Sequence, residues 1–488
     1  MSIIDALSNQ SATKRTENGA MAYSTLGNPI TDLFAQIGAL RPRSELEIEA
    51  KFEAAFNLDP NMALRMFLYA GDIREGLGER RTFRTILEWL AEEYPTVTKG
   101  LVPYIGEYNR FDSLFVLVDT PVEDEMWSYV AWRLSEDMKA LAINNFSNVS
   151  LLAKWMPSEN ASSVKTRYLA KRAYMALGLS PRMYRKMLSK IRKFLHVVEC
   201  DMSAGNWNLN FSAVPARAML NYRNAFMNHN PEGFQKYIDA LQKGKTKINA
   251  SVLYPYNLVS KYAANRYSIR STIDPIVEEQ WKALPNYITG HNNILVMADV
   301  SGSMTGRPME TSVGLGIYFA EHNEGLFHNK LITFTDEPDF ISLDFERTLC
   351  DKVAAVMGRV GYSTNLEAAF NLVLTAAVNN HVNPVDMPTA IVVISDMEID
   401  SPYYKDLDFI AQMRRTYGMF GYELPKLVMW NVEARNDTFL SREEGIINVS
   451  GQSTITFKSL LRCLNGENVD VVRDTLMVER YDIVDDLV

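Results

Sequence analysis

Apolar residues recur at spacings of three and four along residues 31–286, which is the period of an amphipathic α-helix. Ser44 and Glu47 have the spacing of a capping box, and Asp59 and Pro60 pair an N-cap residue with a proline at the first helical position. We find no fixed repeat length. We nevertheless expect an all-α, HEAT-like helical repeat domain, with helices at residues 82–93, 126–138, 163–177, 181–198 and 231–242.

The pattern changes after residue 286. Residues 294–298 form an apolar run with the length of a buried parallel strand, and a polar Gly/Ser turn and a helix at 309–321 follow. The alternation predicts a doubly wound α/β domain with two closing helices at its end. The expected strands are 330–334, 390–395 and 426–432, and the expected helices are 346–357, 366–378, 407–417, 457–464 and 469–484.

These patterns divide the chain into four segments. We expect an N-terminal arm (1–30), the helical repeat domain (31–286), the α/β domain (287–465) and a C-terminal closing helix (466–488). No apolar run reaches the ~18 residues of a transmembrane helix, and the polar N-terminus does not resemble a signal peptide. Three widely spaced cysteines favour reduced thiols. We therefore expect a cytoplasmic protein without a membrane partner, in the host cytoplasm if the protein is viral.

The net charge of −9 is unevenly distributed. Residues 1–290 carry 35 Lys and Arg against 30 Asp and Glu, whereas residues 291–488 carry 15 against 29. Residues 151–250 are strongly basic, with 17 Lys and Arg against 5 Asp and Glu. A basic segment in an acidic protein suggests a surface for a polyanion.

The basic residues of this segment fall in two helical clusters and one loop. They could follow a phosphate backbone while Tyr168, Tyr174 and Tyr184 stack on bases; the alternative is a solvated helix face with core tyrosines. Arg74, Arg80 and Arg81, which flank glycines, could also contact a phosphate, or the glycines could simply form an inter-helix turn. The predicted RNA-binding residues are Lys165, Arg167, Lys171, Arg172, Arg182, Arg185, Lys186, Lys190, Lys193, Lys243, Lys245 and Lys247.

A second candidate site follows the strand at residues 294–298. Asp299, Ser301 and Ser303 lie on a tight loop with Gly302, at the sheet edge where ligands bind in open α/β folds. One carboxylate and two hydroxyls can turn three oxygens toward a hard cation such as Mg²⁺ or Mn²⁺. The alternative is a turn with local side-chain hydrogen bonds.

These residues resemble the DxSxS metal-ion-dependent adhesion site of von Willebrand factor A (vWA) domains. In that family a Thr and an Asp from two further loops complete the site, and the resemblance assigns these roles to Thr364 and Asp396. The Thr loop departs from the usual Gly-Gly-Thr, so Ser363 is an alternative ligand. The resemblance also implies that the metal accepts a carboxylate from a protein partner.

The layout of a helical part followed by a vWA-type part resembles the TROVE (telomerase, Ro and vault) proteins, and more closely a TROVE-related family of plants, phages and large viruses. The resemblance rests on residues 16–20, 71–80, 153–157, 184–188 and 243–249. Ro-type members are rings that bind structured RNAs with single-stranded ends. This implies a Ro-like protein whose helical domain binds small structured RNA and whose vWA domain binds a metal and a partner.

Two other classes of function stay open. One is a metal-dependent protein-interaction or assembly module, such as a phage or viral structural or scaffold component, that does not bind nucleic acid. The other is an enzyme, which we do not expect because no nucleophile and base can be assembled near the Asp299 loop.

Overall fold

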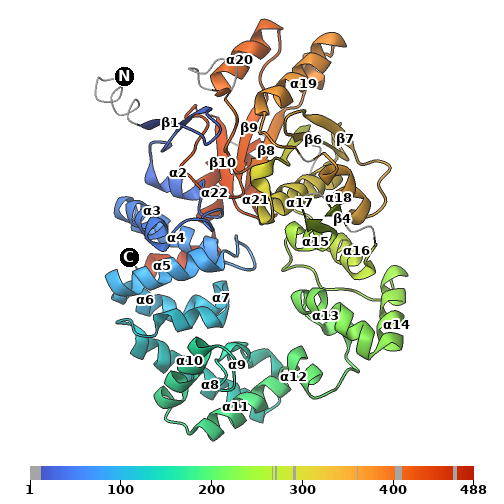
Figure 1. Cartoon of the computed structure of the whole chain (residues 1–488). Coiled ribbons are helices and arrows are strands. Elements are labelled where there is room, and N and C mark those ends of the chain that lie inside the picture. Colours follow the sequence, from blue (N-terminus) through green and yellow to red (C-terminus); the bar gives the residue numbers. More distant parts are fainter. Residues whose placement is uncertain are drawn as a thin grey trace. The chain divides into compact units, whose positions relative to one another are not determined.

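The computed structural model describes residues 12–265, 268–269, 272–288, 293–359, 361–401, 409–443, 445–464 and 470–487. Residues 1–11 of the expected N-terminal arm lie outside this set. The chain forms two compact units, each built from distant stretches of sequence (Figure 1). The sheet unit combines Met1–Met66 with Ala250–Glu479, and the helical unit combines Phe67–Asn249 with Arg480–Val488.

The sheet unit contains a six-stranded sheet of order β10-β9-β8-β5-β6-β7. All neighbours pair in parallel except β6 and β7, which are antiparallel. The expected α/β fold is confirmed at this level, although the edge strands β7 and β10 were not predicted. The strands are β5 (Ile294–Asp299), β6 (Lys330–Phe334), β7 (Asp339–Ser342), β8 (Ala390–Ser395), β9 (Lys426–Asn431) and β10 (Ile446–Ser450).

Helices cover both faces of this sheet, as expected for buried parallel strands. On one face, Leu295 and Met297 of β5 belong to a core that includes residues of α19 and α20. On the other face, Val296 and Ala298 lie against Gly316 of α17. The helices after β5 are α17 (Arg307–His322), α18 (Leu349–Met357), α19 (Leu366–Asn379), α20 (Phe409–Met419), α21 (Thr456–Leu464) and α22 (Val471–Leu476).

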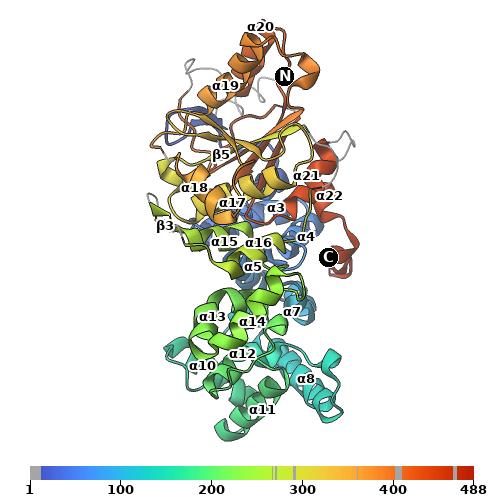
Figure 2. The ribbon, with the colours of Figure 1, turned by 90° about the vertical axis from the view of Figure 1, so that its right-hand side faces the viewer.

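Two stretches from outside the expected α/β domain pack in the sheet unit. Helix α15 (Pro255–Tyr262) lies along α17, so closely that a Cβ at Gly314 would meet Pro255 at 2.9 Å. Figure 2 shows α15 and α16 (Pro275–Lys282) beside α17 and α18. Near the N-terminus, α2 (Pro29–Phe34) contacts β10, and α3 (Glu45–Leu58) follows with the expected capping box of Ser44 and Glu47. Two short strands, β1 (Thr13–Arg15) and β2 (Met21–Tyr23), form a hairpin before them, and β3 (Ala263–Asn265) and β4 (Ser268–Ile269) form another after α15.

The helical unit consists of helices and connecting turns, as the spacing of its apolar residues predicts. Neighbouring helices such as α13 and α14 pack in sequence order, and Phe67 of α4 stacks on Phe83 of α5. The helices are α4 (Pro60–Gly71, which begins in the sheet unit), α5 (Arg80–Glu93), α6 (Pro95–Leu101), α7 (Ile105–Tyr108), α8 (Glu123–Ala142), α9 (Leu152–Trp155), α10 (Val164–Ala176), α11 (Pro181–Phe194), α12 (Val198–Ser203), α13 (Ala216–His229) and α14 (Pro231–Gln242).

The glycine-rich stretch between α4 and α5 is a turn that its glycines make possible. A Cβ at Gly76 would lie 2.2 Å from the carbonyl oxygen of Tyr69, and Gly78 has a φ of 63°. Asp72 in this turn is fully buried and accepts hydrogen bonds from Arg480 and Tyr481 near the C-terminus. The turn therefore anchors the last residues of the chain to the helical unit.

Across the described residues, no helix is both long enough and apolar enough to cross a membrane.

Candidate metal centre

The candidate centre lies where β5 and β8 end. These neighbouring parallel strands pair Ala298 with Ile394, so the next residues, Asp299 and Ser395, also meet. The Ser395 hydroxyl donates to Asp299 Oδ2 at 2.6 Å. Asp396, the following residue, is thereby brought to the same edge of the sheet as Asp299.

The loop after β5 links these two carboxylates through hydroxyl groups. The Ser301 amide donates to Asp299 Oδ1 at 2.8 Å, and the Ser301 hydroxyl also bonds to Asp299. The Ser301 and Ser303 hydroxyls lie 3.2 Å apart, and Ser303 bonds in turn to Asp396. A continuous series of hydrogen bonds thus joins Asp299, Ser301, Ser303 and Asp396, four of the five residues predicted from the sequence.

Burial makes the charge of this group costly. Burial, and then the negative charge of Asp396, raise the pKa of Asp299 to about 7. Burial also raises the pKa of Asp396, while the nearby Arg435 guanidinium opposes the shift. Arg435 Nη2 donates to Asp396 Oδ2 at 2.6 Å, whereas within the described chain no Lys or Arg pairs with Asp299. The edge therefore holds one neutralised carboxylate and one without a cation.

Thr364, the fifth predicted ligand, is buried in the loop before α19, and its bonds run elsewhere. Its amide donates to Asp400 Oδ2 at 2.9 Å, and its carbonyl accepts from the Asp400 amide at 3.0 Å. The alternative ligand, Ser363, bonds to Asp336 through its amide and its hydroxyl. Within the described residues, no hydrogen bond links Thr364 or Ser363 to the four joined residues.

An N-terminal segment, Thr16–Ala20, lies on the loop that carries Asp396. The Thr16 hydroxyl donates to the Ile399 carbonyl at 2.6 Å, the Glu17 amide to Glu398 Oε2 at 2.6 Å, and Asn18 Nδ2 to the Glu398 carbonyl at 2.7 Å. Glu17 also lies 3.5 Å from Arg435. Sequence reasoning missed Ser395, Arg435 and Glu398; only Ser395 had a signal, since it ends a predicted strand just before Asp396.

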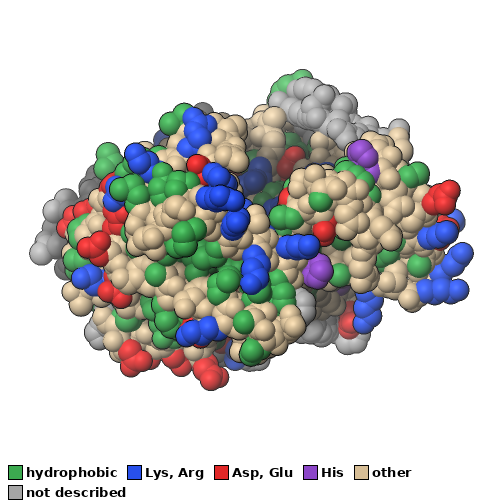
Figure 3. Space-filling model, turned by 90° about the horizontal axis from the view of Figure 1, so that it is seen from below, with side chains coloured by type: hydrophobic (Ala, Val, Ile, Leu, Met, Phe, Trp, Pro, Cys, Tyr) green, Lys and Arg blue, Asp and Glu red, His purple; other side chains and the backbone are tan. Residues whose placement is uncertain are grey.

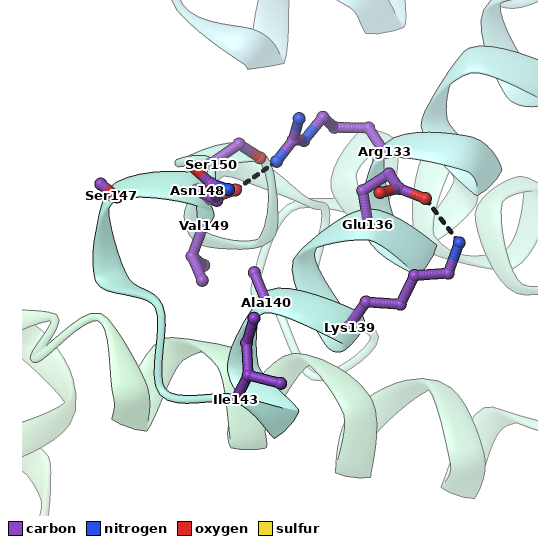
Figure 4. A pocket seen from close by; sticks show the side chains of 9 residues that line it. All are labelled: Arg133, Glu136, Lys139, Ala140, Ile143, Ser147, Asn148, Val149 and Ser150. Atoms are coloured by element: carbon purple, nitrogen blue, oxygen red, sulfur yellow. Dashed lines mark hydrogen bonds and ion pairs between the residues drawn. The ribbon is translucent and has the colours of Figure 1, made fainter.

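The described residues contain no group of three or more His, Cys, Asp or Glu side chains that could hold a metal, and this edge itself brings together two carboxylates and two hydroxyls. A pocket away from this edge is a hollow of about 560 Å³ between α8 and residues 147–150 (Figure 4). Its charges are already paired, Arg133 with Asp137 and Lys139 with Glu136. The hollow therefore offers no free charge to a ligand.

The predicted RNA-binding residues divide into two groups. Three are held by internal contacts: Arg167 bonds to the carbonyls of Ala161 and Ser162, Arg172 pairs with Asp119 and Glu123, and Arg185 pairs with Glu159. The other nine are exposed, and the structure assigns them no ion pair: Lys165, Lys171, Arg182, Lys186, Lys190, Lys193, Lys243, Lys245 and Lys247.

The predicted stacking role fails for one tyrosine. Tyr184 is fully buried and donates to the Pro157 carbonyl at 2.7 Å, so it is a core residue. Tyr174 packs edge-on against Tyr184, and the Tyr168 hydroxyl bonds to Asp119. On the face seen in Figure 3, Lys and Arg side chains nevertheless follow one another across the middle, while Asp and Glu lie mainly toward the edges.

Fold and site together define a two-unit protein in which a helical unit accompanies an α/β unit with an oxygen-rich sheet edge. Residues 293–482 match a family described as "Domain of unknown function (DUF7788)", and residues 16–101 and 165–292 match "Domain of unknown function (DUF2828)". Uncharacterized protein L728 of Acanthamoeba polyphaga mimivirus is 31% identical over 491 residues, covering 92% of this chain and 84% of that protein. The chain belongs to the same family as this mimivirus protein.

These matches correct the resemblance inferred from the sequence. The chain matches these two families and the mimivirus protein, and no TROVE or vWA family is found for it. The prediction of a Ro-like family member was therefore wrong. The prediction went wrong because it rested on two features that separate families can share: a helical half, and an Asp-x-Ser-x-Ser turn after a buried strand.

Proposed function

We propose that the sheet unit binds a divalent cation, Mg²⁺ or Mn²⁺, through Asp299, Ser301, Ser303 and Asp396, and that it is a metal-dependent protein-interaction module. The observation that carries this proposal is the convergence of two carboxylates and two hydroxyls at one sheet edge. Thr364, in the loop before α19, is the fifth proposed ligand.

The chemistry of these residues fits such a cation. Carboxylate and hydroxyl oxygens are hard donors of the kind that Mg²⁺ and Mn²⁺ prefer. Asp299 is fully buried and has no cationic partner among the described residues, which is costly for a carboxylate unless a cation compensates it. A bound cation would supply that charge and an open position for a carboxylate of an acidic partner.

The first test is metal binding by the full chain. We expect Mn²⁺ and Mg²⁺ to raise the melting temperature, because a ligand at about 100 times its Kd adds about 2.7 kcal/mol to the free energy of unfolding. Asp299→Asn should lose this effect. Asp386→Asn, which changes an exposed aspartate in the same unit, is the matched control and should keep it. An equal metal-induced shift in the wild type and Asp299→Asn would contradict the proposal.

The second part of this test concerns the partner. An immobilised Asp- and Glu-rich peptide should retain the wild type in Mn²⁺ and release it in chelator, and Ser303→Ala should bind weakly in both conditions. If the protein stays bound to the peptide in chelator, the metal does not form the contact between them.

A second candidate function, RNA binding by the helical unit, is favoured by one observation. Nine of the twelve predicted basic residues are exposed and have no ion-pair partner assigned to them among the described residues. Exposed cations that are free of carboxylates can neutralise phosphates and release counterions.

The test is binding of a structured RNA with a free single-stranded end at ~50 and ~200 mM salt; affinity should fall at least about tenfold between them. Lys186→Glu with Lys190→Glu should weaken binding at both salt concentrations. Lys51→Glu with Lys282→Glu in the sheet unit is a control of equal charge change. If the control variant loses as much RNA affinity as the Lys186/Lys190 variant, the RNA is attracted by the charge of the whole protein and not by the exposed basic residues of the helical unit.

The finer description of the fold is part of the same proposal. Sequential packing of neighbouring helices supports a HEAT-like array in the helical unit. Central parallel strands with an antiparallel edge, and a polar loop directly after β5, support a vWA-type arrangement in the sheet unit.

A further inference from the structure

A separate cluster of positive charge lies inside the helical unit. It is formed by Arg80 and Arg84 on α5, Arg110 just before a short 3₁₀-helix (Phe111–Leu117), and Lys154 next to Trp155 on α9. We call these four basic residues the arginine cluster. It shares no residue with the nine exposed basic residues discussed above.

Two of its guanidinium groups share a single carboxylate. Arg110 Nε donates to Asp112 Oδ1 at 2.9 Å, and Arg84 Nη2 lies 2.9 Å from the same oxygen. The Arg84 and Arg110 guanidinium groups therefore compete for one carboxylate, and, against the effect of its burial, they together lower the pKa of Asp112. Arg84 Nε donates to the Ser113 hydroxyl at 3.1 Å, which fixes the orientation of the guanidinium plane.

Trp155 holds two members of the cluster in place. The Arg110 guanidinium carbon lies 3.9 Å above the indole ring, and Lys154 Nζ lies 5.5 Å from the ring centre. An arginine stacked on an aromatic face loses little further freedom when it binds a ligand. Arg110 is therefore pre-organised, with one edge toward Asp112.

Arg80 adds a fourth positive charge. It lies one helical turn before Arg84 on the same face of α5, is exposed, and has no hydrogen bond or ion pair to any described residue. Partial burial of its guanidinium group, and then the charges of Arg110 and Arg84, lower the pKa of Arg80. Three guanidinium groups, those of Arg80, Arg84 and Arg110, thus lie near Asp112, and one carboxylate cannot neutralise all three.

We propose that the arginine cluster is a binding site for a phosphate group. Several guanidinium groups that converge on one place match the oxygens of a phosphate dianion, which can accept from each of them. Arg84 and Arg110 already share Asp112, so the exposed Arg80 beside them is the group that still lacks an anionic partner among the described residues. This site does not depend on the metal centre. It also revises the expectation that Arg74, Arg80 and Arg81 contact a phosphate, because Arg74 pairs with Glu107 and Arg84 and Arg110 lie near Arg80 instead.

The experiment is calorimetric titration of the full chain with inorganic phosphate, at an ionic strength held constant with chloride. Phosphate should bind, and Arg80→Gln should weaken the affinity about tenfold, the usual effect of one charge-assisted hydrogen bond. Arg80→Gln removes no internal contact and should fold normally. Arg80→Lys should restore part of the affinity, and Lys99→Gln on α6 is a matched loss of one exposed charge that should change nothing.

Two further titrations identify the source of the phosphate. A short RNA with a 5′-phosphate is compared with the same RNA carrying a 5′-hydroxyl. If both inorganic phosphate and the phosphorylated RNA bind through Arg80, the site takes a terminal phosphate of RNA. If phosphate binds and the two RNAs do not differ, the ligand is a small phosphate compound. No phosphate binding, or equal binding by Arg80→Gln and the wild type, would overturn the proposal.

Discussion

At the scale of single residues, the position of an aspartate in the sheet decides which groups surround its carboxylate. Asp299 and Asp396 are 97 positions apart in the order of the chain, yet they share one site because β5 and β8 are parallel neighbours. Their roles differ because Arg435 neutralises Asp396 and no comparable charge reaches Asp299. The sequence shows that both positions are aspartates, but it does not show which of the two carboxylates has a cationic partner.

This imbalance makes a prediction about pH. The pKa of Asp299 is raised from 3.8 to about 7, so the folded state binds a proton between these values that the unfolded state releases. Through this group, the free energy of unfolding of the metal-free protein should decrease as pH rises from about 4 to 7. Melting curves in chelator should show a steeper decline for the wild type than for Asp299→Asn. Equal slopes would mean that Asp299 keeps an ordinary pKa.

At the scale of elements, most helices and the four central strands agreed with their predicted positions, because buried strands and amphipathic helices have distinct apolar periods. The strands β7 and β10 were missed. Each lies at an edge of the sheet, is short and is only partly buried, so its pattern is weaker than that of a central strand. The predicted helix at 469–484 is in fact α22 followed by a 3₁₀-helix, Glu479–Asp486.

The loop that carries Thr364 also shows what a sequence pattern cannot predict. A sequence can place Thr364 just before α19, but it cannot show that Asp400 takes both of its backbone groups. Arg435 lies in the loop after β9, the strand next to β8, and no local pattern distinguishes it from a solvated arginine. Such residues are found only when the strand order is known.

At the scale of the whole molecule, the compact units are made of distant stretches of chain. Among the described residues, 12–66 and those between 250 and 479 share the sheet unit, whereas 480–487 belong to the helical unit. Arg480 and Tyr481 bind the buried Asp72, and the Tyr108 hydroxyl donates to the Arg480 carbonyl at 2.5 Å. The C-terminus is therefore part of the helical core.

This anchor predicts a large effect of a small change near the C-terminus. Arg480→Ala leaves the Asp72 carboxylate buried without its cation, and breaking a buried ion pair costs about 3–5 kcal/mol. Because Arg480 is partly exposed and Asp72 keeps Tyr481 and the Arg74 amide as donors, we expect about 2–3 kcal/mol, measured by urea unfolding. Arg473→Ala in the sheet unit is the control. A loss below about 0.5 kcal/mol, typical of surface substitutions, would show that the anchor is not needed.

The sequence by itself determined the helical and α/β character of the two parts, the polar loop after β5 with its carboxylate and hydroxyl oxygens, and the basic character of residues 151–250. These properties follow from local periodicity, local turn chemistry and charge, which depend on neighbours in the chain. Only the tertiary structure decided which stretches share a unit, that Arg435 and the Thr16–Ala20 segment meet the Asp396 loop, and that Arg80, Arg84 and Arg110 surround Asp112. Those contacts join residues far apart in sequence, and they form only once the packing of the core has brought their backbones together.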